Sequence, residues 1–185
     1  MDIKKGRKKW CSVIASENFN KLPIGEIPCY SAENLVGRSL WVNLAHLSND
    51  VKDYSIKVRF KINKIIGDKA ETELIGYDLL NTYMKRIVRP GRDRIDDSFI
   101  VNSNDKVKLR VKMVYIARSN INRSLSREIM MKAREIINDF FGKTDYNSAL
   151  NEIIANRLQR NMKSVLNKIY PLSSVDVRKI ELLKA

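Results

Sequence analysis

The sequence is poor in the side chains that build catalytic and metal sites. Its 185 residues include one histidine, His46, and two cysteines, Cys11 and Cys29. A serine or cysteine hydrolase usually needs a histidine base beside its nucleophile. The two cysteines also lack the CxxC spacing of a zinc site. We therefore expect reduced thiols, no metal, no cofactor and no enzyme activity.

Glycine and long apolar runs are equally scarce. The seven glycines are not clustered, so no phosphate-binding glycine loop is present in the sequence. No stretch approaches the ~20 apolar residues that cross a membrane. The cationic N-terminus is not followed by the apolar core of a signal peptide. These absences predict a soluble, cytoplasmic protein with no membrane partner and no small-molecule substrate.

Positive charge is what the sequence has in excess. Lys and Arg number 35 against 21 Asp and Glu, which gives a net charge of +14. Such a chain repels itself unless a polyanion accompanies it. Residues 1–9 hold five cations and too few apolar side chains to build a core, so we expect a disordered basic arm there. Its cations are Lys4, Lys5, Arg7, Lys8 and Lys9.

Strands are predicted in the first half of the chain. Residues 38–44 alternate between apolar and polar side chains, and residues 53–63 do so more clearly. In the second strand the apolar residues are Ile56, Val58, Phe60 and Ile62, and the outward cations are Lys57, Arg59 and Lys61. A turn around Gly67 leads to a returning strand over about 70–77. Residues 77–91 have helical spacing that ends at Pro90-Gly91.

The second half combines a hairpin with helices. Residues 97–118 predict a hairpin with its turn at 102–105, and its second strand points Lys108, Arg110 and Lys112 outward. Helices are expected over 124–142, 147–155 and 156–169, with Ser124 or Ser126 as the first N-cap. The stripe expected in the first of these helices is Ile129, Ala133, Ile136, Ile137 and Phe140.

The last strand breaks its own alternation. Val175 and Val177 lie one residue out of phase with Ile180 and Leu182. A β-bulge at Arg178-Lys179 would absorb the extra residue. It would place those four apolar residues on the core face. It would turn Asp176, Arg178, Lys179 and Glu181 outward.

The pattern as a whole predicts an α+β fold with an antiparallel sheet. We expect a single domain over residues 10–185. Residues 10–118 are mainly β with one short helix, 119–170 are helical, and 171–185 form a terminal strand that returns to the sheet.

The outward cations suggest nucleic-acid binding. Two strands each present three cations spaced two residues apart, roughly 6.6–6.8 Å per step, close to the phosphate spacing of a nucleic-acid strand. The alternative is a solvated face whose lysines discourage edge pairing. RNA is favoured over a membrane, because no amphipathic anchor helix is evident. It is favoured over DNA, because no helix-turn-helix or zinc finger is evident. Further candidates are Lys85, Arg86 and Arg89 on the first helix, and Arg118, Arg123 and Arg127 near the second.

Four sequence blocks, in order, resemble a known family. They are Trp10, Val13, Phe19, Ile24 and Gly25; VGRSLWVNLAHLSND at 36–50; GYDL at 76–79; and IYPLSSVDVRKIELLK at 169–184. The chain resembles the S3Ae (eS1) family of small-subunit ribosomal proteins, shared by archaea and eukaryotes. Its short ends indicate the archaeal form, because eukaryotic members are longer.

The resemblance implies a β-barrel-like core and a structural role without catalysis. It implies a place on the platform of the small subunit near the messenger-RNA exit. The implied partners are small-subunit ribosomal RNA and neighbouring platform proteins, so the protein would be cytoplasmic and ribosome-associated. The matching basic positions are Arg38 and Arg178-Lys179.

Two other readings stay open on the sequence. One is a free RNA-binding or regulatory protein outside the ribosome. The other is a nucleic-acid-processing enzyme, which the missing histidine and acid constellation disfavours.

Overall fold

The computed structural model describes residues 8–183 except 31, 49 and 68. The chain divides into two compact units, Met1–Gly76 and Tyr77–Ala185. Most of the expected arm, with Lys4, Lys5 and Arg7, lies outside the described residues. Lys9 is already the first residue of a strand. The prediction of one domain over residues 10–185 stays a prediction.

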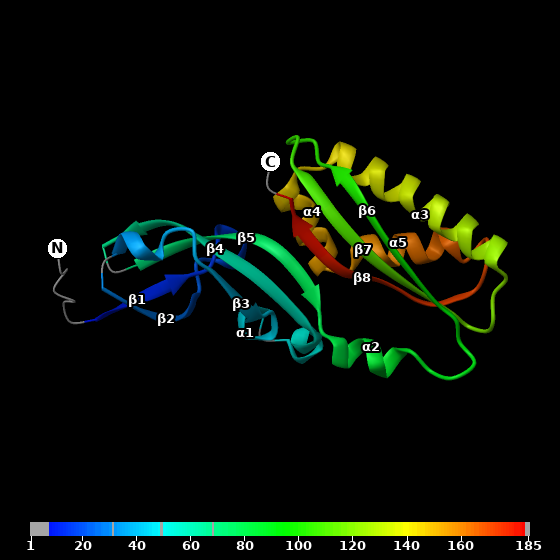
Figure 1. Cartoon of the computed structure of the whole chain (residues 1–185), viewed down its shortest axis with the longest axis horizontal. Helices are drawn as coiled ribbons and strands as arrows, with labels where there is room; N and C mark the ends of the chain where they lie inside the picture. The colour runs from blue at the N-terminus through cyan, green and yellow to red at the C-terminus, as the bar shows by residue number, and fades with distance from the viewer. Residues whose placement is uncertain (1–7, 31, 49, 68, 184–185) are drawn as a thin grey trace, which may run out of the picture. The chain divides into compact units, whose positions relative to one another are not determined.

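Four strands and the first part of a fifth build the first unit, Met1–Gly76 (Figure 1). They are β1 (Lys9–Ile14), β2 (Pro23–Cys29), β3 (Ser39–Asn43), β4 (Ile56–Ile66) and β5 (Lys69–Leu79). β1 pairs with β2 antiparallel and with β5 parallel, and β4 pairs with both β3 and β5. The connections contain η1 (Glu17–Phe19), η2 (Ala32–Leu35), the single helical turn α1 (Ala45–Ser48) and η3 (Val51–Ser55).

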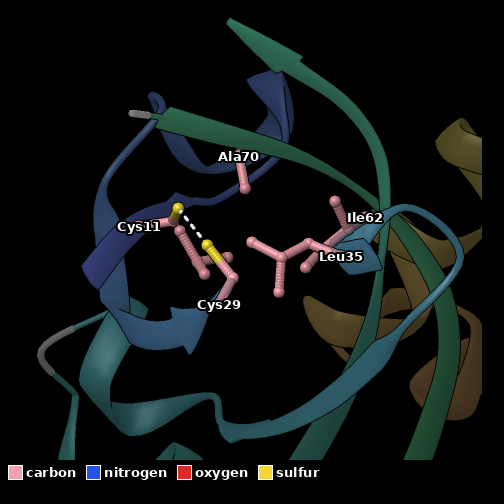
Figure 2. Packing of buried hydrophobic residues seen from close by; sticks show 6 residues of the cluster. Cys11, Cys29, Leu35, Ile62 and Ala70 are labelled. Atoms are coloured by element: carbon pink, nitrogen blue, oxygen red, sulfur yellow. Dashed lines mark hydrogen bonds between the residues drawn. The ribbon is translucent and has the colours of Figure 1, made fainter. Parts of the chain in front are cut away.

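The core of this unit confirms the predicted alternation of β4. Val58, Phe60 and Ile62 are fully buried, whereas the lysines and arginine between them point away from the core. Ile62 also belongs to a buried cluster with residues of β1 and β2, among them Cys11, Val13 and Cys29. Figure 2 shows its two cysteine sulfurs, Cys11 Sγ and Cys29 Sγ, pointing at each other at 2.8 Å. Both cysteines are present as reduced thiols.

The second unit is a sheet with helices packed on it. Its strands follow the order β5-β8-β7-β6, where β6 is Arg94–Asn102, β7 is Lys108–Ala117 and β8 is Leu172–Leu182. Its helices are α2 (Asn81–Ile87), α3 (Arg123–Lys143), α4 (Tyr146–Ile154) and α5 (Arg157–Leu166). The terminal strand β8 therefore returns to the sheet, between β5 and β7, as predicted.

The second half of strand β7, residues 113–117, is buried on both of its faces, which its sequence pattern did not predict. Met113 and Tyr115 are buried on one face, and Val114 and Ile116 on the other. Helix α3 packs on β6 and α5 on β8, which covers the first face. The buried Met84 of α2 lines a groove with residues of β6 and β8 on the second face.

The α+β class is confirmed, but the barrel-like closure is wrong. The sheet runs β2-β1-β5-β8-β7-β6, with β4 and β3 branching from β5, and within the described residues β2 and β6 do not pair. Because β8 pairs with both β5 and β7, it extends the sheet instead of closing it. The sheet also contains one parallel pair, β1 with β5.

Helix boundaries needed correction at two places. Helix α2 begins at Asn81, later than expected, because residues 77–79 still belong to β5. Helix α3 is capped by Asn122, whose carbonyl accepts hydrogen bonds from the backbone N–H (3.0 Å) and hydroxyl (3.2 Å) of Ser126. Neither Ser124 nor Ser126 is therefore the N-cap. In the stripe of α3, Phe141 is fully buried and the expected Phe140 only partly.

The bulge in β8 is confirmed. Lys112 of β7 pairs with Lys179 and the next residue, Met113, with Val177, so Arg178 has no partner on β7. Val175, Val177 and Ile180 are buried as predicted, but Leu182, near the strand end, is 37% exposed.

A second bulge was not predicted. Ile116 pairs with Ser174 and Ala117 with Leu172, which skips Ser173. The freed carbonyl of Ser173 accepts a hydrogen bond from Lys163 Nζ at 2.6 Å, and its hydroxyl accepts one from Arg92 at 3.0 Å. Ser173 has no partner in the β7–β8 ladder, so side chains from outside the sheet supply the hydrogen bonds of its carbonyl and hydroxyl groups.

The sequence predicted that Asp176 points into solvent, and this prediction is wrong: its side chain is partly buried. Burial raises the pKa of this carboxyl, partly offset by a hydrogen bond from Ser174 and by the charge of Lys163. The physical reason is that α2 lies on this side of the sheet, where its Met84 and Lys85 line a groove together with Arg178 of β8. The nearby Asp176 charge adds to the burial that raises the pKa of Tyr83 of α2.

Candidate RNA-binding surfaces

The outer face of β3 and β4 carries the first predicted row of cations. Lys57, Arg59 and Lys61 stand opposite Asn43, Trp41 and Ser39 of β3. Lys57 and Arg59 are exposed, and Lys61 is half-buried. All three β3 residues opposite them are uncharged, so β3 offers no acidic side chain to pair with these cations. We refer to these six residues as the β3–β4 face.

Arg59 is held in place on the β3–β4 face. Its Nε and Nη2 atoms donate hydrogen bonds to Ser39 Oγ at 3.1 and 2.8 Å. Its guanidinium carbon lies 5.6 Å from the centre of the Trp41 ring, a cation–π contact. Beyond the row, Asn63 donates to Glu73 at 2.6 Å. The exposed Arg38 adjoins the same strand, because its carbonyl accepts from Ile62 N–H.

A groove in the second unit brings together cations that are far apart in the sequence. It has a volume of about 490 Å³ and is lined by Asn81, Met84, Lys85, Val88, Arg94 and Arg178. Lys85 and Arg178 were both predicted as RNA contacts. Arg94 was missed, although it opens the RIDD segment of β6, and it pairs with Asp96 at 2.5 Å. We call this the α2 groove.

The second predicted row of cations, on β7, meets acids that the linear pattern did not reveal. Lys112 Nζ lies 3.6 Å from a Glu181 carboxylate oxygen, and Lys179 Nζ lies 2.5 Å from the other. The hydrogen bond from Lys179 is the main cause that lowers the pKa of Glu181. Arg110 stands opposite Glu181 in the β7–β8 ladder. The cations of this row are thus partly neutralised within the protein.

Another acid, Asp78, lies near the same cations from β5. Its pKa is raised by burial, and the charges of Lys179 and Arg178 oppose that rise.

The remaining predicted cations are exposed but scattered. Arg86 lies over the Tyr83 ring at 5.3 Å, and Lys8 over the Tyr30 ring at 5.4 Å. The others are exposed at the ends of elements or just beyond them: Lys9, Arg89, Lys108, Arg118, Arg123 and Arg127. The structure brings none of these into the two surfaces defined above. RNA contact at any of the predicted positions stays a prediction.

Neither a metal cluster nor a membrane-spanning helix is found in the described part of the chain. Residues 8–183, apart from 31, 49 and 68, contain no cluster of three or more His, Cys, Asp or Glu side chains suited to a metal ion. Within the same residues, no helix combines the length and apolar character that a membrane crossing needs.

Comparison with known proteins gives a consistent result. The model of the ribosomal S3Ae family matches residues 4–185. The chain is 32% identical to the small ribosomal subunit protein eS1 of Nanoarchaeum equitans, over 89% of this chain and 83% of that protein. It is also 32% identical to the proteins of that name from Methanothrix thermoacetophila and Methanobrevibacter smithii. Those matches cover 95% of this chain and 83% and 91% of the relatives.

These three relatives are archaeal, which supports the archaeal form of the family. The chain belongs to the ribosomal S3Ae family, whose members are structural ribosomal proteins and not enzymes, as the sequence predicted.

Proposed function

We propose that this protein is a structural constituent of the small ribosomal subunit and binds its ribosomal RNA. The observation that carries the proposal is the family match over residues 4–185, together with relatives named as small-subunit proteins. The net charge of +14 supports it, because assembly with an RNA polyanion would relieve the self-repulsion of the chain. The protein would then act in the cytoplasm as part of the ribosome.

Within the subunit, we place it on the platform near the messenger-RNA exit, beside other platform proteins. This position follows from the family resemblance. Chemical cross-linking of purified subunits, read by mass spectrometry, tests it. Cross-links mainly to proteins of the head or the body would contradict the position without affecting the ribosomal role.

Sedimentation separates the ribosomal role from that of a free RNA-binding protein. The endogenous protein is expected to co-sediment with small subunits through a high-salt gradient. Recovery of the protein only at the top of the gradient would contradict the proposal.

The β3–β4 face supports RNA binding most directly, because the β3 residues opposite its three cations carry no negative charge. In the variant Lys57→Gln/Lys61→Gln, affinity for small-subunit RNA should fall. The slope of log affinity against log salt should drop by about 1.4 to 1.8, since each lost phosphate contact contributes about 0.7 to 0.9. Arg59 is left unchanged because it also supports the fold through Ser39.

A matched control removes two lysines outside every predicted position. Lys132 and Lys168 are exposed, and Lys132 is paired with Glu135 on its own helix. The variant Lys132→Gln/Lys168→Gln should keep the salt slope of the original protein. An equal loss in both variants would show that only net charge matters.

A further inference from the structure

We propose that an unpaired RNA nucleotide stacks on Trp41 and Arg59 of the β3–β4 face. The inference rests on the proposed RNA-binding function and deepens it. It assigns a ligand class, a single-stranded base with its two flanking phosphates, to a face that otherwise offers only charge.

The position of Trp41 follows from strand geometry. Leu40 and Val42 point toward the core of the first unit, so the residue between them must point outward. Trp41 is 43% exposed. A large aromatic ring is thus held on a rigid strand with almost half of its surface open to solvent.

Arg59 and the Trp41 ring together form a preorganised surface on which a base can stack. It stands directly opposite Trp41 in the ladder and lies over the ring at 5.6 Å. Two of its five N–H groups donate to Ser39, which fixes the guanidinium plane. Bases stack well on both indole rings and guanidinium planes. The side chains therefore need little reordering before a base arrives.

The charges around the ring suit the phosphates of the same nucleotide. Lys57 and Lys61 lie two residues to either side of Arg59, roughly 6.6–6.8 Å away along the strand. A nucleotide whose base covers Trp41 would place its 5′ and 3′ phosphates toward these two lysines. A duplex would not fit in this way, because its bases are already stacked on each other and show only their edges.

The other tryptophan of the chain, Trp10, provides a contrast. Trp10 is 64% exposed on β1, and it stands opposite Pro28 of β2. It therefore lacks the cross-strand arginine that Trp41 has. It serves as the matched control for an exposed tryptophan without this setting.

Tryptophan fluorescence tests the proposal on the full-length protein. In the variant Trp10→Phe, Trp41 is the only tryptophan. A ten-nucleotide single-stranded RNA of mixed sequence should quench its emission on binding. A duplex of the same number of phosphates should quench it far less at equal occupancy, measured by fluorescence anisotropy of labelled RNA.

Substitution adds a second readout. Trp41→Leu should weaken single-strand binding about 5- to 150-fold, the fold-change that corresponds to losing one stacked base. It should leave the salt slope unchanged, because no charge is removed. Trp10→Leu should leave both quantities unchanged, and thermal unfolding should show that both variants are folded.

The outcomes distinguish this inference from the proposed function. If small-subunit RNA binds with a steep salt dependence while Trp41 is not quenched and Trp41→Leu binds normally, the stacking site is wrong and RNA binding stands. Equal quenching by duplex and single strand would also overturn the stacking site. If the protein binds no ribosomal RNA at moderate salt, the proposed function itself fails.

Discussion

Deletion of Arg178 from β8 is expected to be tolerated, although the strand lies inside the sheet. Arg178 has no partner on β7, because Lys179 already pairs with Lys112 and Val177 with Met113. After the deletion, these pairs become consecutive steps of a regular ladder. Every core residue of β8 keeps its face, since the side-chain period of a strand is two.

The expected magnitude is small. The deletion removes one residue that the β7 ladder does not use, and it exchanges the local bend of a bulge for regular pairing. The free energy of unfolding should change by about 1 kcal/mol or less, the net value of a single hydrogen bond. The α2 groove loses one of its cations, so RNA affinity is measured separately.

Deletion of Lys112 is the matched control. It also removes one cation from the same face, but β7 pairs with β6 there without a bulge. Leu109 and Val111, both essentially buried, would move to the opposite face. At about 1.5 to 3 kcal/mol for each apolar side chain, the loss is about 3 to 6 kcal/mol. That is a large share of a typical stability of about 5 to 15 kcal/mol.

Urea unfolding followed by circular dichroism gives both free energies, and the slope m shows whether the native state stays compact. If deleting Arg178 destabilises as much as deleting Lys112, the bulge is not what reconciles the two halves of β8. The assignment of Arg178 as the surplus residue would then be wrong.

Three further predictions concern stability. Arg134 donates two hydrogen bonds to the buried carboxylate of Asp97, one of them at 2.8 Å. Arg134→Ala should cost about 3 kcal/mol in urea unfolding, at the low end for a broken buried pair because Arg134 is half exposed. The double variant Asp97→Leu/Arg134→Met should regain most of the lost free energy of unfolding, because no buried charge is left unpaired. A double variant as unstable as Arg134→Ala would contradict this explanation. Oxidised glutathione should join Cys11 and Cys29, each thiol losing its hydrogen as the reagent is reduced to two thiols. Because the cysteines are 18 residues apart, the closed loop should add about 3 kcal/mol. Thiol titration that still finds two free thiols after treatment would refute it. Burial raises the pKa of Asp176, so its ionisation opposes folding above that raised pKa and has no effect well below the unfolded value. Asp176→Asn should therefore raise the melting temperature at pH 7 and lose this advantage toward pH 3, whereas an equal effect at both pH values would point to packing.

Local periodicity was sufficient to predict the strands whose two faces differ. The alternation of β4 predicted its buried and exposed residues correctly, because one face meets the core and the other does not. The phase slip in β8 predicted a bulge at the right residue for the same reason. In both strands, a single local rule and the tertiary environment agree.

The errors arise where a second layer of structure covers a strand. The second buried face of β7 and the half-buried carboxylate of Asp176 depend on α2, which follows β5 in sequence but lies against residues of β6 and β8. The bulge at Ser173 depends on Lys163 and Arg92, which supply its hydrogen bonds. Arg92 lies 81 residues from Ser173. Lys163 is only 10 residues away but belongs to another element, α5, so the alternation within β8 does not reveal it.

The two rows of cations show most clearly what pairing adds to a sequence pattern. Lys57, Arg59 and Lys61 of β4 and Lys108, Arg110 and Lys112 of β7 are indistinguishable as linear patterns. The residues of β3 opposite the first row are uncharged, whereas Glu181 of β8 lies beside the second row. A cation that already shares a carboxylate gains less from a phosphate, because it must give up part of that interaction first. The β4 row should therefore contribute more to RNA affinity than the β7 row. Pairing register, which no local window encodes, decides between the two.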